Sequence, residues 1–242
     1  MPGGSSLPGS GHLDDRQHRI HRSPLLFTAP VVLLTALVFM TVWAMVMGNL
    51  PQAVRQEWPW RLALLDQEAL GSLLAVALGC VFARAQYAQT VRPVIGWRGK
   101  VSSSRTGMSS KLVWVVEIRS GGTHNAVAAS VEYYVQPRGA ETLPADVPWH
   151  GYQAAIEELE SLGLQIGKDF DINPLGSGFP LSAATDKGLY AACLSIGAIS
   201  VLDNLYIRLR VTDGVGDTHE RILHCLRGAE VEIRSALATD ES

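Results

Sequence analysis

The stretch Leu25 to Met47 reads LLFTAPVVLLTALVFMTVWAMVM and contains no charged residue. A helix crosses the hydrocarbon core of a bilayer with about 20 apolar residues, so this stretch predicts a membrane-spanning helix. Pro30 falls in its first turns, where a missing backbone N–H costs least. A secretory signal peptide is the alternative. Its apolar core would cover only about 7 to 15 residues and end at an A-x-A site, which is absent here.

A second, weaker apolar segment, Ala69 to Ala83, reads ALGSLLAVALGCVFA. Extension to Ala88 brings it to the spanning length of about 20 residues, with Arg84 reaching the interface along its aliphatic stem. Asp66 and Glu68 precede it, where the helix dipole favours anions. We expect a helical transmembrane hairpin over residues 23–91, with spans at 25–47 and 69–88; a buried helix of a soluble domain is the alternative for the second segment.

Small residues recur at every fourth position of the second segment, at Gly71, Ala75, Gly79 and Ala83. Such a strip lets membrane helices approach closely, so we expect packing on the first helix or on a second copy, giving a homo-oligomer. The alternative is that Gly and Ala are simply frequent in membrane helices.

Positive charge is unevenly distributed around the two segments. Only Arg55 and Arg61 lie in the connection between them, against the following residues outside it: Arg16, Arg19, Arg22, Arg84, Arg92, Arg98 and Lys100. This asymmetry predicts a multi-pass protein of the cell membrane with both termini in the cytoplasm. If the second segment does not span, the soluble domain lies outside.

The remainder, residues 92–235, has the texture of a β-rich soluble domain. Period-two alternation marks strands around Leu112–Ile118, Val127–Val135, Leu205–Val211 and His219–Leu226. The first two are predicted to form one hairpin and the last two another, the second across Asp213–Asp217. A sheet of antiparallel strands with one solvent-exposed face needs a second layer to cover its apolar face, which favours a β-sandwich.

Shorter signals complete the expected domain. Val94–Val101 and Ala229–Ile233 are strand candidates, and Leu189–Leu202 is long enough for one or two buried strands. An amphipathic helix is expected from Tyr152 to Leu162, ending at Gly163. Residues 1–22 are interpreted as a disordered cytoplasmic tail and residues 236–242 as an acidic tail.

The segments Val116–Val135 and Arg210–Asp217 resemble immunoglobulin-like sandwich modules in their strand-turn-strand texture. The resemblance covers about a quarter of the chain and implies a fold only, with no functional residues. The chain departs from antibody-type domains because it lacks their paired cysteines and intervening tryptophan.

One surface of the predicted sandwich is a candidate binding face. Tyr134, Tyr206, Arg208 and Arg210 form an aromatic and basic group if their strands are neighbours, and such a group suits a protein partner or a small anionic ligand. The alternative is a solvated face, in which the two arginines pair with Glu117 or Glu132 across strands.

Patterns for metals, catalysis and polyanions are weak. His219 and His224 are five residues apart on a predicted strand and therefore point to opposite faces, unlike a zinc-protease pair. Asp213 and Asp217 bracket a turn without calcium-loop spacing. Cys193 and Cys225 read as buried thiols, with a disulfide as the alternative. A net charge of −3 does not suggest nucleic-acid binding, and no metal or cofactor is expected.

Three functions stay open at this stage. The leading hypothesis is a non-enzymatic, membrane-tethered binding or scaffolding protein, with the lipid bilayer as one partner. The second is a membrane effector whose helical hairpins assemble and permeabilise the bilayer in response to the soluble domain; ion leakage that is lost when Gly71 and Gly79 are enlarged distinguishes it. An enzyme is third, because no nucleophile, base and orienting group are recognisable together.

Overall fold

A computed structural model describes residues 13–21, 24–51, 67–103, 108, 110–122, 124–140, 143–144, 146–182 and 188–240. The chain divides into two compact units. One is Arg22–Val91; the other joins Met1–His21 with Arg92–Ser242. The β unit is therefore built from chain on both sides of the helical unit. The connection between the two predicted spans, residues 52–66, lies outside the described residues.

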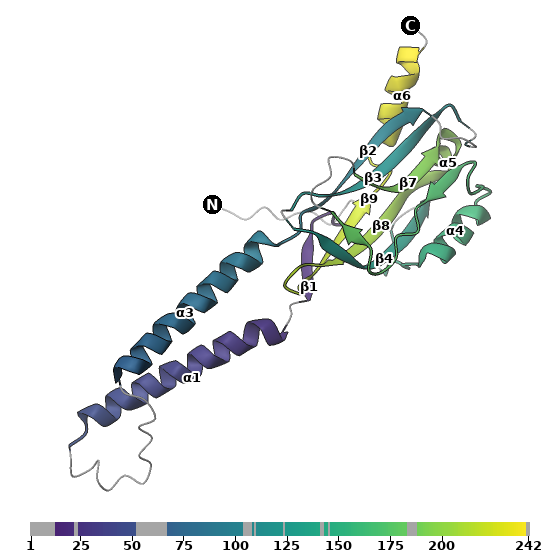
Figure 1. The fold of residues 1–242 in the computed structure, drawn as a ribbon. Helices are drawn as coiled ribbons and strands as arrows, with labels where there is room; N and C mark the ends of the chain where they lie inside the picture. The colour runs from purple at the N-terminus through teal and green to yellow at the C-terminus, as the bar shows by residue number, and fades with distance from the viewer. Residues whose placement is uncertain are drawn as a thin grey trace, which may run out of the picture. The chain divides into compact units, whose positions relative to one another are not determined.

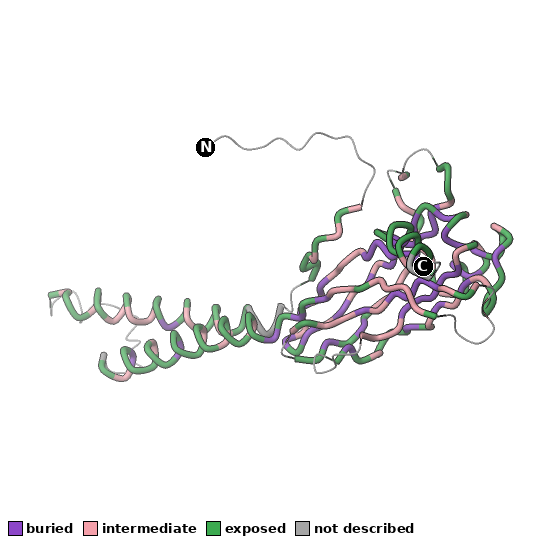
Figure 2. The backbone as a smooth tube through the Cα atoms, turned by 90° about the horizontal axis from the view of Figure 1, so that it is seen from above, coloured by how far each residue is buried: buried purple, intermediate pink, exposed green. Residues whose placement is uncertain are grey.

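The helical unit consists of α1 (Pro24–Asn49) and α3 (Gln67–Thr90), which contact each other (Figure 1). Thr28–Asn49 and Glu68–Thr90 are long and apolar enough to cross a membrane, as predicted, and most of their described residues are exposed or half-buried (Figure 2). In α1 the hydroxyl of Thr41 donates to the carbonyl of Leu37 at 2.8 Å, which satisfies a polar group inside an apolar helix. Pro30 lies inside α1 without ending it.

The β unit contains two sheets of antiparallel strands (Figure 1). The first has the order β1-β9-β8-β4-β6, and its strands are β1 (His18–His21), β9 (Thr218–His224), β8 (Leu202–Thr212), β4 (Ala126–Pro137) and β6 (Pro180–Leu181). The second has the order β2-β3-β7-β5, and its strands are β2 (Ile95–Ser103), β3 (Leu112–Ser120), β7 (Leu189–Ser195) and β5 (Phe170–Ile172).

Pairing corrects one of the two predicted hairpins. β8 and β9 pair across the turn at residues 213–217, as expected. β3 and β4 do not pair, because β3 lies between β2 and β7 in one sheet and β4 lies beside β8 in the other. The chain thus passes from one sheet to the other between β3 and β4. Alternation identifies a strand with one buried face, but it does not identify the strand's partner.

Helices replace strands or tails at three predicted places. Leu189–Leu202 contains β7 followed by α5 (Ile196–Val201), whose Ser195 hydroxyl accepts from the Ala198 N–H at 3.1 Å as an N-cap. Ala229–Ile233 is not a strand but the start of α6 (Ala229–Asp240), which also includes most of the predicted acidic tail. The predicted amphipathic helix is confirmed as α4 (Tyr152–Ser161), with its Ala155, Ile156 and Leu159 buried.

The N-terminal segment is also partly ordered. Residues 13–21 belong to the β unit, and β1 pairs with β9, so the prediction of a disordered tail is wrong for this part. Residues 1–12 lie outside the described residues. Low hydrophobicity misled the prediction because β1 is held by backbone pairing and polar side chains, with all four residues exposed.

One core lies between the two sheets. Its largest buried side chains include Phe170 and Ile118 from one sheet and Ile207 and Leu209 from the other. Trp114 is buried in this core, and its indole N–H donates to the carbonyl of Cys225 at 2.7 Å. Such a bond removes the cost of burying the indole donor.

The three cysteines are free thiols. Cys193 packs in a small cluster with Val113 and Val115, whereas Cys225 lies in the main core, so a disulfide between them is excluded. Burial raises the pKa of the Cys225 thiol, which keeps it protonated and unreactive.

Gly99 of β2 faces the Trp114 ring so closely that a Cβ would overlap it. We expect Gly99→Ala to lower the free energy of unfolding by about 1–3 kcal/mol through overpacking. Gly96→Ala on the same strand is the control, because its nearest neighbour, the Arg119 carbonyl oxygen, is 3.9 Å away. Urea unfolding of the full chain in detergent, followed by tryptophan fluorescence, measures both. Equal stability of the two variants would contradict this packing.

Candidate functional site

The predicted binding face lies on the outer side of the β4-β8-β9 sheet. Tyr133 and Val135 point into the core, and alternation along β4 therefore turns Glu132, Tyr134 and Gln136 outward. The register places Glu132 opposite Arg208 and Tyr134 opposite Tyr206. The structure thus brings Tyr134, Tyr206, Arg208 and Arg210 together on neighbouring strands.

The aromatic half of this face is a stack. The Tyr134 and Tyr206 rings lie 5.9 Å apart at 24°, and the Tyr206 and His224 rings meet edge-on at 4.9 Å. Trp149 covers Tyr134 at 6.4 Å and 66°. The hydroxyl of Tyr206 donates to Gln136 Oε1 at 3.2 Å. Tyr206 is 1% and Tyr134 8% exposed, so the stack is mostly a packed layer whose accessible edge is Trp149.

The basic half of the face is paired with carboxylates. Arg208 donates through Nε to Glu132 at 2.8 Å, and its guanidinium carbon lies 4.5 Å above the Trp149 ring. Arg210 donates through Nε to Glu220 at 2.7 Å and lies 3.7 Å from Glu132. Two arginines thus face two glutamates, and the face carries no surplus positive charge from these four residues.

This pairing decides between the two partners foreseen for the arginines. Glu132 is the partner of Arg208, while Glu117 lies in the other sheet, where it pairs with Lys100 and contacts Arg119 at 3.7 Å. The side chains of Arg208 and Arg210 are 18% and 33% exposed. A small anion would therefore have to displace a carboxylate, whereas a protein surface can pair with both signs of charge.

Two residues of this region were not foreseen, Trp149 and Glu158. The segment before α4 is joined to β4 by two backbone hydrogen bonds between Tyr133 and His150, both of 2.8 Å. This attachment places Trp149 over Tyr134 and brings α4 beside the face. In the sequence, their place in the face was indicated only by a tryptophan that stands shortly before a predicted amphipathic helix.

Glu158 of α4 has a carboxylate oxygen that is buried and has no hydrogen-bond partner among the described residues. Burial raises the pKa of Glu158, with the positive charge of His150 acting in the opposite direction. Burial also raises the pKa of Tyr134, and the Glu158 charge adds to that effect. A carboxylate and a phenol with raised pKa values therefore lie near one edge of the face.

The residues considered for metals have structural roles. His219 Nε2 lies 3.0 Å from Asp213 Oδ2, and both side chains are almost fully buried. The other oxygen of Asp213 accepts from the N–H groups of Val215 and Asp217, closing the β8-β9 turn. His224 lies on the opposite face against Tyr206, as predicted. Within the described part of the chain, no three His, Cys, Asp or Glu residues gather as a metal site.

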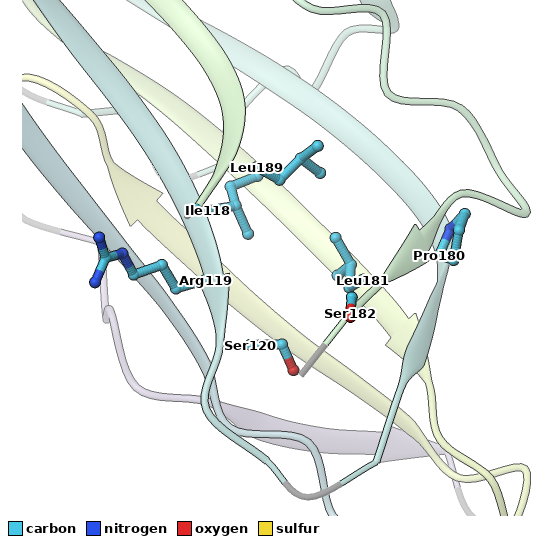
Figure 3. Close-up of a pocket in the computed structure, with 8 residues that line it drawn as sticks. Ile118, Arg119, Ser120, Pro180, Leu181, Ser182 and Leu189 are labelled. Carbon is cyan, nitrogen blue, oxygen red and sulfur yellow. The ribbon is translucent and has the colours of Figure 1, made fainter. Parts of the chain in front are cut away.

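A cavity of about 200 Å³ lies at the end of β3, beside β6 and the start of β7 (Figure 3). Ile118, Leu181 and Leu189 line it, together with Ser120, whose hydroxyl is buried without a partner among the described residues. Arg119, Pro180, Ser182 and Gly188 also line it, and residues 183–187 are not described. We assign no ligand to this cavity.

The small-residue strip of α3 is exposed in a single copy. A Cβ at Gly71 or Gly79 would meet nothing within 4 Å. Leu70 and Ala77 are the buried residues of α3 among those described. Packing of the strip on a second copy stays a prediction.

No family model, no curated protein and no solved structure matches this chain.

Substitution of Glu158 tests the electrostatics of the face. Because its folded pKa is raised, ionised Glu158 destabilises the fold; the penalty is absent below the ordinary pKa of 4.5 and complete above the raised value. We expect Glu158→Gln to stabilise the chain at pH 7 by at most about 1 kcal/mol, since the side chain is partly solvated, and the gain should vanish near pH 4. Thermal unfolding between pH 4 and pH 8 measures it, with exposed Glu160→Gln as control. A gain that persists at pH 4 would point to a cause other than charge burial.

Proposed function

We propose that this chain is a membrane-tethered binding or scaffolding protein: a two-helix hairpin anchors it and a sandwich-type β module, facing the cytoplasm, binds a protein partner. The exposed apolar surface of α1 and α3 supports the anchor. The candidate spans have 22 and 23 residues, and at about 1.5 Å per residue each exceeds a hydrocarbon core of about 30 Å. Side chains this apolar need lipid rather than water.

The observation that supports the hairpin proposal is that the first sheet contains strands from both sides of the two helices in the chain. β1 lies before α1 in the chain, β9 lies after α3, and the two strands pair in one sheet. Segments that pair in this way must lie on the same side of a membrane, which requires an even number of crossings between them. The charge asymmetry of the sequence then favours the cytoplasmic side for both ends.

The composition of the candidate face supports a protein as the partner. Protein interfaces are enriched in tyrosine, tryptophan and arginine, which are the residues found at Tyr134, Trp149 and Arg208. Since Glu132 and Glu220 neutralise the two arginines, the face suits a partner with charges of both signs better than a small anion. The half-buried Trp149 ring and the ion pairs of Arg208 and Arg210 would then supply the contact.

A membrane effector is the second candidate, and one observation favours it. The chain segments that enter and leave the helical unit both belong to the β unit, where the Gln17 side chain joins them. A β unit built in this way is covalently continuous with both helices, and the Gln17 bonds lie within that unit. No comparable observation favours an enzyme.

Thiol labelling tests the anchor and its orientation. In a Cys80→Ala background, which leaves only buried native thiols among the described residues, we expect Pro51→Cys to react with a membrane-impermeant maleimide in intact cells. Ala140→Cys, which is exposed on the β unit, should react only after lysis. Labelling of both positions in intact cells would place the β unit outside and reject the hairpin.

Substitution of Trp149 tests the binding face. We expect Trp149→Ala to weaken capture of a crosslinked protein partner at least about ten-fold, since buried aromatic anchors dominate interface energies. Gln153→Ala, an exposed position on nearby α4, should leave capture unchanged. Circular dichroism of both variants verifies folding. Undiminished capture by a folded Trp149→Ala chain would remove this face from the proposal.

A further inference from the structure

The segment Asp14–His21 lies where an edge of one sheet meets an edge of the other, and we call this boundary the seam. β1 is an edge strand of one sheet, beside β9, and β2 is an edge strand of the other. No backbone ladder joins β1 or β9 to β2 among the described residues. Side chains join them instead, and they converge on Ile95, the first residue of β2.

Gln17 is the centre of this seam. Its amide nitrogen donates to the carbonyl of Pro93 at 2.7 Å, and its amide oxygen accepts from the Ile95 N–H at 2.9 Å. Arg221 of β9 donates to the carbonyl of Ile95. The Ile95 side chain is fully buried, so these bonds attach Gln17 to a residue of the core. Gln17 lies a few residues before α1, and Pro93 and Ile95 directly follow α3.

The rest of the segment is attached by the backbone pairing of β1 with β9 and by exposed ion pairs. Arg19 lies 3.2 Å from Asp217 and Arg227 lies 3.2 Å from Asp15, and both arginine side chains are substantially exposed. Exposed ion pairs of this kind contribute little. β1 itself has four residues, all exposed, with an irregular register between Arg19 and His21. Short edge elements with few buried contacts open at low free energy.

The binding face and this seam share one strand. On β9, Glu220 pairs with Arg210 of the face, and the same residue is the backbone partner of His18 in β1. His224, four residues on, contacts Tyr206. A partner that draws Arg210 away from Glu220 therefore acts on the strand that holds β1.

We propose that residues 14–21 are a releasable latch: engaged, it holds together the chain segments that flank α1 and α3, and released, it lets the two helices change their packing. The Gln17 bonds to Pro93 and Ile95 keep the latch engaged. Strand β9 connects the latch to the binding face, because it pairs with β1 and carries Glu220. This inference rests on the proposed membrane anchor, and it gives the proposed binding face a consequence inside the membrane.

The test uses the full chain in lipid nanodiscs. Gln17→Ala removes both bonds, and Gln17→Glu keeps an acceptor for the Ile95 N–H while losing the donor to Pro93. Gln153→Ala is the matched control, since Gln153 is an exposed glutamine of α4 whose side chain donates to Glu157 at 3.4 Å. Hydrogen exchange reports the latch. Nitroxides at Val32→Cys and Phe82→Cys, two exposed helix positions, report the helices in the Cys80→Ala background.

In Gln17→Ala, we expect exchange of β1 and of the Ile95 amide to accelerate about ten-fold, because the bonds that limit local opening are lost. The nitroxide distance distribution should broaden or shift in the same variant. Gln17→Glu should show a smaller change of both kinds, and Gln153→Ala no change. A thermal midpoint close to that of the unmodified chain shows that the variants are folded.

Two results would overturn the latch. If hydrogen exchange at the Ile95 amide is unchanged in Gln17→Ala, the Gln17 bonds do not limit local opening. Accelerated exchange with an unchanged nitroxide distribution would mean that β1 is an edge strand without influence on the helices. Failure of the anchor itself is distinguishable, because the unmodified chain would then leave the membrane fraction in alkaline carbonate.

Discussion

Ile95 is a residue at which the two sheets of the β unit are joined by hydrogen bonds. Its side chain is fully buried in the shared core, its N–H is bound by Gln17 and its carbonyl by Arg221. Two sheets that meet without a common ladder leave backbone groups unpaired along their edges, which is costly in a core. Here side chains from the N-terminal segment and from β9 supply the partners. The chain on either side of the helical unit is thereby committed to one domain.

The outer face of the β4-β8-β9 sheet shows how polar residues can be packed without becoming a charged pocket. Arg208 and Arg210 are only partly exposed, and each has a carboxylate partner. Trp149 lies over the Arg208 guanidinium, which excludes water from one side of it. Glu158, in contrast, has a buried oxygen without a partner among the described residues. The face therefore combines a network of paired charges with one partly buried carboxylate, Glu158, at its edge.

Several elements were predictable because their signals are local. The apolar runs that became α1 and α3 were visible from length and the absence of charge. Alternation identified β3, β4, β8 and β9, and the apolar stripe identified α4. The face residues Tyr134, Tyr206, Arg208 and Arg210 were foreseen as a group because alternation assigns them to the outer sides of their strands. Trp149 was missed because its position depends on the backbone bridge between Tyr133 and His150. Local periodicity does not indicate a contact between residues that are so far apart in the sequence.

The sequence by itself determined which segments are apolar enough for a membrane and, in β3 and β8, which residues face inward, because both follow from composition and from the two-residue repeat of a strand. In β4 the bulge between Ala128 and Ser130 reverses the repeat, so Val127 is exposed although alternation placed it on the buried face. Only the tertiary structure decided that β3 and β4 lie in different sheets, that Ala229–Ile233 is helical and that the N-terminal segment joins the domain. Strand partners are chosen by the shared core and by hydrogen bonds between distant residues. Gln17 and Ile95 are 78 residues apart, and nothing in the neighbourhood of either residue records the other.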